Sequence, residues 1–235
     1  MLKEAFQYIV GLGNKGIIPV GGQTYATGNL ELVAEATTTT LKVRNLSGIV
    51  EYIQNDYDQQ PPMLVHIESP TEVRVLSTFN RDKRRNVLVQ AEALLPSIPF
   101  KSFLSVEEFN ILLQSCFVQS ADRDTLLKVV GNIKEDNVKT TGDDGISQSV
   151  TAKTGITAVA DVKVPNPVTL KPFRTFVEIS QPTCDFVFRM QDGPRAALFE
   201  ADGGAWKLQA MADIKEYLMQ SLKEDIESGR VFIIA

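Results

Sequence analysis

The stretch that decides the fold is residues 63–93, in which three apolar segments are separated by polar turns: Met63-Leu-Val-His-Ile-Glu68, Val73-Arg-Val-Leu-Ser-Thr-Phe79 and Val87-Leu-Val-Gln-Ala-Glu-Ala93. Apolar and polar residues alternate along the second segment, which is the period of a half-buried strand. The connections are too short for parallel crossovers, which need a dozen or more residues. The stretch therefore predicts a meander of three antiparallel strands.

Helical patterns lie on both sides of this meander. Before it, Asn45 is a good N-cap for a helix with Leu46, Ile49 and Ile53 on its inner face. After it, Ser105 and Glu108 have the spacing of a capping box, which predicts a helix start. A second helix is expected from Asp122, so the two form a helical hairpin. Three weaker patterns predict a short helix over 2–10, an irregular connection over 11–29 and a short strand over 41–44.

The second half returns to strand patterns and ends in a helix. Residues 135–141 and 146–153 predict a β-hairpin around an Asp-Gly turn, followed by a strand over 157–163. A second hairpin is expected from 185–190 and 195–200. Near-heptad apolar spacing over 205–228 predicts a long amphipathic helix, and 230–235 a terminal strand. The predicted class is α+β, with antiparallel meanders and hairpins, a helical hairpin and a long C-terminal amphipathic helix.

Composition limits the class of protein. The chain has 235 residues, 43% hydrophobic and 23% charged, with a net charge of −5, which is typical of a globular protein. We expect one domain over 1–235, with sub-lobes 1–133 and 134–235. The negative charge argues against a surface built wholly for nucleic acid or anionic membranes. With no signal-peptide pattern and no apolar run near the ~20 residues of a membrane span, we expect a soluble, cytoplasmic protein without a membrane partner.

The usual catalytic signatures are weak. Gly11-Leu-Gly13-Asn-Lys-Gly16 matches a dinucleotide-binding loop, but a predicted helix precedes it where a strand is required. His66 is the single histidine and is interpreted as a structural strand residue beside Glu68. Cys116 and Cys184 are widely spaced and are interpreted as buried free thiols in a reducing compartment. The sequence therefore predicts no catalytic residue, no cofactor and no metal site.

Carboxylates offer one route to metal chemistry. Asp143 and Asp144, together with Glu135 or Asp136, could hold a hard cation across the first hairpin. We interpret them first as solvated turn residues. A metal-dependent nucleotide hydrolase that uses Glu68, Asp143 and Asp144 is the third functional hypothesis.

Two sets of residues are candidates for binding. Arg81, Lys83, Arg84 and Arg85 crowd a predicted hairpin tip beside Phe79, where they could bind phosphate or single-stranded nucleic acid. A solubilising turn or a subunit salt-bridge patch explains the same loop. Trp206, Met211 and Leu218 on the C-terminal helix are candidates for an oligomer interface, with packing on the chain's own sheet as the alternative.

Several strings in the chain resemble the uncharacterised phage and prophage proteins typified by YfdQ. They are Leu46-Ser-Gly-Ile-Val-Glu-Tyr-Ile53, Val129-Val-Gly-Asn-Ile133, Gly142-Asp-Asp-Gly-Ile-Ser-Gln148, Val164-Pro-Asn-Pro-Val168, Pro172-Phe-Arg-Thr-Phe176, Ser180-Gln-Pro182 and Phe232-Ile-Ile234. The resemblance implies a phage or prophage origin and a location in the host cytoplasm. It supplies no established activity and no functional residues.

The first hypothesis is therefore a non-enzymatic, phage-encoded accessory protein that forms a homo-oligomer and binds a host factor or a small ligand such as a nucleotide. The alternative is a single-stranded nucleic-acid-binding factor in phage replication or recombination, which depends on the loop at 81–85.

Overall fold

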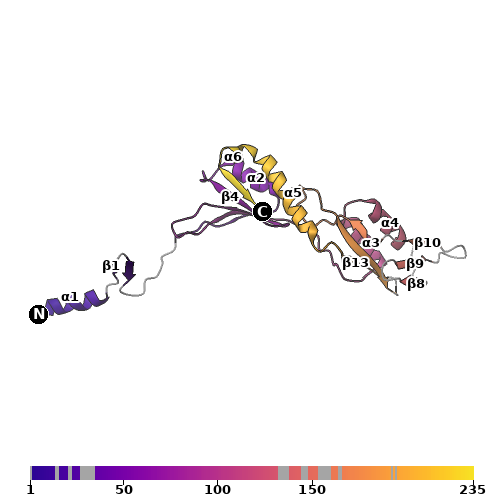
Figure 1. Ribbon diagram of the computed structural model, residues 1–235, viewed down its shortest axis with the longest axis horizontal. Helices are drawn as coiled ribbons and strands as arrows, with labels where there is room; N and C mark the ends of the chain where they lie inside the picture. The colour runs from indigo at the N-terminus through magenta and orange to yellow at the C-terminus, as the bar shows by residue number, and fades with distance from the viewer. Residues whose placement is uncertain are drawn as a thin grey trace. The chain divides into compact units, whose positions relative to one another are not determined.

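The computed structural model describes residues 2–13, 16–20, 23–26, 35–131, 138–143, 148–152, 160–163, 166–191, 193 and 195–235. The chain divides into two compact units, Met1–Thr37 and Thr38–Ala235. Helices and strands are mixed along the sequence, which confirms the predicted α+β class (Figure 1). No helix in the described ranges is both long and apolar enough to cross a bilayer.

The first unit contains α1 (Leu2–Gly13) and a two-stranded hairpin of β1 (Ile17–Val20) and β2 (Gln23–Ala26). The short N-terminal helix was predicted, although it runs three residues further. The prediction of an irregular connection is wrong for both strands, because the β-branched pair at 17–18 and the Thr-Tyr pair at 24–25 favour extended backbone.

A five-stranded sheet lies at the centre of the second unit, in the order β14-β4-β5-β6-β3. The predicted meander is confirmed, since β4, β5 and β6 pair antiparallel. Both edge strands pair in parallel, which the local pattern did not predict. The strands are β3 (Leu41–Val43), β4 (Met63–Ser69), β5 (Glu72–Leu76), β6 (Val87–Glu92) and β14 (Val231–Ile234).

Helices cover one face of this sheet. They are α2 (Leu46–Asn55), α5 (Ala205–Ser221) and α6 (Lys223–Glu227), drawn together on one side in Figure 1. Asn45 caps α2 as predicted, and its side-chain oxygen accepts from Gly48 N–H at 3.1 Å. The segment predicted as one long helix is divided at Leu222, whose backbone (φ −108°, ψ 25°) leaves the helical region while its side chain stays buried.

A four-stranded antiparallel sheet and the helical hairpin form the other main layer pair of this unit. The hairpin packs on the sheet, and its capping box is present as predicted, with the Ser105 hydroxyl and the Glu108 carboxylate each bonded to the other's backbone N–H. The sheet order is β11-β12-β13-β7. The elements are α3 (Val106–Cys116), α4 (Ala121–Gly131), β7 (Leu104–Ser105), β11 (Val168–Leu170), β12 (Cys184–Gln191) and β13 (Arg195–Glu200).

The remaining sheet contains β8 (Val138–Asp143), β9 (Gln148–Ala152) and β10 (Ala160–Lys163), all antiparallel. The strands of the predicted hairpin and the strand after it are therefore found. Asp144 and Gly145 of the predicted turn lie outside the described residues, as do Glu135 and Asp136, whereas Asp143 is the last residue of β8.

Two apolar cores stabilise the second unit. The hairpin core joins α3 and α4 to the four-stranded sheet and includes Phe109, Phe117 and Phe186. The sheet core joins α2 and α5 to the five-stranded sheet and includes Ile49, Val65 and Ile214. Each core takes residues from both sides of position 133, where the sequence placed a sub-lobe boundary. The single-domain description of 1–235 stays a prediction.

Candidate functional site

The basic loop at 81–85 is an ordered turn between β5 and β6. The Asn80 side chain organises it, since its Oδ1 accepts from the N–H groups of Asp82 at 3.0 Å and Arg84 at 2.8 Å. The Arg85 guanidinium lies 4.0 Å from the centre of the Phe79 ring and donates to Ser77 O. Arg81 forms an ion pair with Asp82 at 3.1 Å. Two of the four cations thus bond within the loop, and all four, including Lys83 and Arg84, are exposed.

The predicted oligomer residues all contact the chain's own cores. Leu218 is completely buried in the sheet core, and Met211 packs against the same core. Trp206 packs against the hairpin core at the start of α5. The structure does not gather these three side chains on one exposed surface, and Leu218 has no surface to offer a partner.

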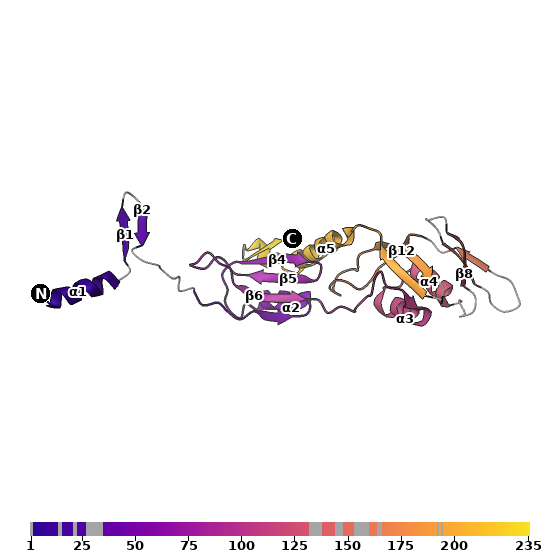
Figure 2. The same ribbon diagram turned by 90° about the horizontal axis from the view of Figure 1, so that it is seen from below.

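The face of the five-stranded sheet opposite its helices is the most distinctive surface of the second unit. Along β4, Met63, Val65 and Ile67 are buried against the helices, so the intervening residues point to the other face. Figure 2 shows β4, β5 and β6 in front of the helices, with no described element across them. We call this surface the open face.

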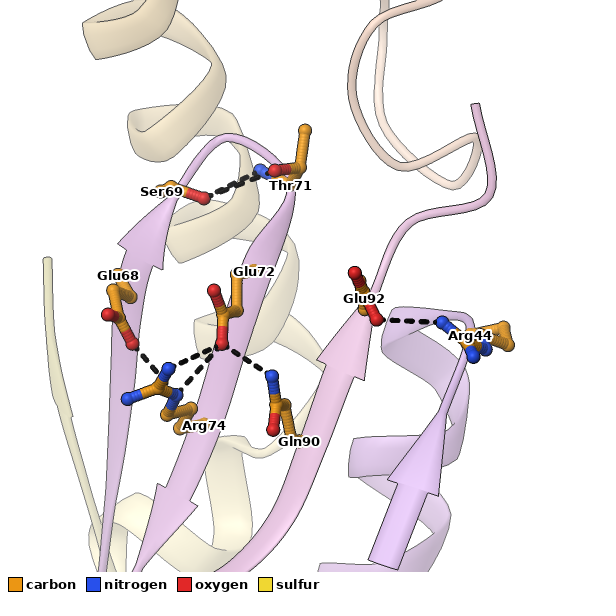
Figure 3. Close-up of polar contacts among 8 residues, drawn as sticks. All are labelled: Arg44, Glu68, Ser69, Thr71, Glu72, Arg74, Gln90 and Glu92. Carbon is orange, nitrogen blue, oxygen red and sulfur yellow. Dashed lines mark hydrogen bonds and ion pairs between the residues drawn. The ribbon is translucent and has the colours of Figure 1, made fainter. Parts of the chain in front are cut away.

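A charged cluster spans β4, β5 and β6 on the open face, near the turn between β4 and β5 (Figure 3). Arg74 on β5 lies between two carboxylates, 2.8 Å from Glu68 Oε2 and 2.7 Å from Glu72 Oε1. Glu72 Oε1 also accepts from the Gln90 amide at 2.6 Å. Glu68 thus pairs with Arg74 rather than with His66, the neighbour expected from sequence. At the edge of the sheet, Arg44 pairs with Glu92 at 2.8 Å.

The edge of the open face formed by β14 is apolar. Phe232 and Ile234 are 58% and 46% exposed, respectively, and lie in register with Leu64 and His66 on β4. The open face therefore combines an exposed aromatic residue, aliphatic side chains and ion-paired charges. That composition resembles the mixed surface of protein interfaces.

Sequence reasoning missed a buried junction between the two cores. Arg174 is 7% exposed, donates from Nη1 to Glu200 at 2.6 Å and stacks 3.8 Å from the centre of the Trp206 ring. Its Nε and Nη2 groups have no hydrogen-bond partner among the residues that the structure describes. In the sequence, Arg174 lies in Pro172-Phe-Arg-Thr-Phe176, which has no apolar periodicity from which its burial could be predicted. This string was noted only because it resembles the phage and prophage proteins.

A cavity of about 290 Å³ adjoins this junction at the start of α5. Burial raises the pKa of the Cys184 thiol to about 11, so the thiol stays protonated at neutral pH. Burial opposes ionisation of Asp202, yet hydrogen bonds from the Gly204 and Trp206 N–H groups hold the pKa of its carboxyl below the usual value. A hydrogen bond also joins the Cys184 thiol to the Asp202 carboxylate in this cavity. The lining residues are Thr183, Cys184, Asp185, Asp202, Ala205, Trp206 and Gln209.

Metal chemistry finds no support among the residues that the structure describes, where no three His, Cys, Asp or Glu side chains could hold an ion together. Asp143 ends β8, and its predicted partner Asp144 lies outside these ranges. Both cysteines are free and buried, as expected. Gly11 and Gly13 lie inside α1, with a strand after them, so the context of a dinucleotide-binding loop is not met.

Comparison of the chain with protein-family models, with curated proteins and with solved structures gives no match.

Proposed function

We propose that this chain is a non-enzymatic accessory protein that self-assembles and acts by binding, through the open face of its five-stranded sheet. The observation that carries the proposal is the asymmetry of that sheet: helices cover one face, while the other presents Phe232 and Ile234 on its β14 edge and the Arg74 cluster across β4, β5 and β6. An exposed aromatic residue and a preorganised arginine on the same face of a sheet are favourable for protein contact, because little side-chain entropy is lost on binding. A phage origin is supported by the sequence resemblance alone.

The experiment that tests this proposal is native mass spectrometry of the full chain, purified without added ligands. We expect multiples of the 25.9 kDa chain at micromolar concentration, because exposed apolar surface favours association. The same spectra report any host protein or small molecule that copurifies. We would reject self-assembly if the mass stayed that of one chain up to about a hundred micromolar. That concentration is far above a dissociation constant of ~1 μM.

The basic loop supports the alternative function, which is the binding of single-stranded nucleic acid. Lys83 and Arg84 are exposed beside the stacked Phe79–Arg85 pair, which offers charge and an aromatic ring together. If this alternative is correct, the variant Lys83→Glu/Arg84→Glu should reduce the salt dependence of oligonucleotide binding by about 0.7 per lost phosphate contact. The matched control is Lys207→Glu/Lys223→Glu, which makes the same charge change on α5 and α6. Equal salt slopes for both variants would remove the loop from consideration.

A further inference from the structure

The edge strand β14 is chemically unlike the opposite edge of the same sheet. It reads Val231-Phe-Ile-Ile234, four β-favouring residues without a charge, and among the described strands it has a neighbour on one side only. The opposite edge, β3, has three residues with Lys42 in the middle. Charged residues and short length are the usual means of protecting a sheet edge from pairing with another strand. By these criteria β3 is protected from pairing with a strand of another chain, whereas β14 is not.

The backbone of β14 presents hydrogen-bonding groups outward. In a parallel ladder, alternate residues direct both their N–H and C=O groups toward the neighbouring strand. Arg230 O accepts from Met63 N at 2.8 Å, and Val231 lies opposite Met63. Phe232 and Ile234 therefore bond to β4, whereas Val231 and Ile233 direct their backbone groups away from it.

The edge is also held rigidly. Arg230, immediately before β14, pairs with Asp56 at 3.0 Å, with Asp225, and with the carbonyl of Ile53. These contacts fix the start of the strand to the ends of α2 and α6. A strand that is already ordered loses less conformational entropy when it pairs.

We infer that β14 pairs antiparallel with β14 of a second copy of this chain, on a two-fold axis through Ile233. This inference rests on the self-assembly in the proposed function. In that register Ile233 faces its own equivalent, and Phe232 of each copy lies opposite Ile234 of the other. The outward groups of Val231 and Ile233 supply the ladder bonds, and the Phe–Ile pairs occupy the close, non-hydrogen-bonded positions on the open face.

A second copy fits this edge because the edge is complementary to itself. Phe232 of each copy contacts Ile234 of the other copy, so both exposed apolar side chains of β14 are covered. The two-fold axis limits the assembly to two chains. The result is one sheet of ten strands with both apolar edges removed from solvent. Since a strand edge buries less than the ~1,200 Å² of a standard interface, we expect a dissociation constant of micromolar order.

The test is sedimentation equilibrium of the full chain and four variants. Phe232→Glu should raise the dimer dissociation constant at least tenfold, because a carboxylate then faces Ile234 of the other copy. The double variant Phe232→Glu/Ile234→Lys should return it close to the original value, since the register sets opposite charges against each other. Ile233→Pro should also abolish the dimer, because proline lacks the N–H that bonds the second copy. That N–H makes no bond to β4, so the substitution removes no hydrogen bond within the chain's own sheet. Leu208→Glu, at a 74% exposed site on α5, is the control and should change nothing.

Hydrogen exchange gives a readout without substitution. Above the dissociation constant, the Val231 and Ile233 amides should exchange more slowly than below it, while those of Phe232 and Ile234, already bonded to β4, should not change. A dimer that resists both Phe232→Glu and Ile233→Pro, with concentration-independent exchange at Val231 and Ile233, would overturn this inference and leave self-assembly intact. A monomeric wild-type chain would instead contradict the proposed function itself.

Discussion

At the scale of single residues, the buried side chain of Gln181 holds the backbone of a neighbouring segment in place. It is 7% exposed, and its Oε1 accepts from the N–H groups of Arg174 at 3.0 Å and Thr175 at 3.3 Å. Its amide donates to the carbonyls of Thr175 and Phe176. One side chain thus satisfies four backbone groups of the segment that joins the two cores.

We expect Gln181→Leu to lower the free energy of unfolding by about 3 kcal/mol, because it leaves several buried backbone groups unpaired at ~1–3 kcal/mol each. Urea unfolding followed by circular dichroism measures the loss. The control is Gln191→Leu, on the exposed end of β12, for which the change should stay within ~0.5 kcal/mol. Equal midpoints for the two variants would show that the segment is held by its apolar residues alone.

A second residue, Tyr52 on α2, gives the molecule an alkaline pH dependence. Burial, together with the hydrogen bond that its hydroxyl donates to Asp58 at 3.0 Å, raises its pKa from 10.0 to about 12. Between these two values the unfolded chain loses the phenolic proton while the folded chain keeps it, so stability falls as pH rises through this window. We expect Tyr52→Phe to flatten the decline of the melting temperature over the same range. An unchanged slope would show that Tyr52 ionises alike in the folded and unfolded chains.

At the scale of elements, the capping box of α3 should lose its stabilising effect at acid pH. The Glu108 carboxylate accepts from the Ser105 hydroxyl at 2.8 Å and from its N–H at 3.0 Å, and these bonds lower the pKa of Glu108. A lowered pKa means that the stabilisation is present above the unfolded-state pKa and is lost as pH falls through the folded one. In Ser105→Ala, an NMR titration should find the pKa of Glu108 moved back up. The control Ser115→Ala, a hydroxyl on the same helix that bonds Ile111 O, should leave it unmoved.

The elements also show what local sequence could predict. The meander, both caps and the hairpin of β12 and β13 follow from periodicity and turn residues, which act over a few positions. The parallel edges do not, because β14 finds its partner β4 across most of the chain and nothing in Val231–Ile234 specifies Met63. The basic loop was visible as a run of charge, whereas the open face exists only once five strands are placed side by side. The Arg174 junction likewise depends on contacts between distant residues.

At the scale of the whole molecule, one segment couples the two cores of the second unit. Arg174 stacks on Trp206 beside the hairpin core, while Phe176 is buried in the sheet core. Two residues later, Glu178 Oε1 accepts from the first N–H groups of α2, those of Leu46 at 2.7 Å and Ser47 at 3.2 Å. A carboxylate at a helix N-terminus is favourable for both hydrogen bonding and the helix dipole. The two cores are therefore not independent, and a substitution that disrupts this segment should destabilise both.

The last prediction concerns the first unit. Both cores consist of residues from the second unit, whereas Leu2, Phe6 and Ile9 of α1 are each more than 60% exposed. We therefore expect a chain beginning at Thr38 to keep the melting temperature of the full chain, measured by calorimetry. If copies associate through β14, the shortened chain should also keep its dissociation constant. A lower melting temperature would show that residues 1–37 stabilise the rest of the chain, while loss of the dimer at constant stability would assign the contact between copies to residues 1–37 and not to β14.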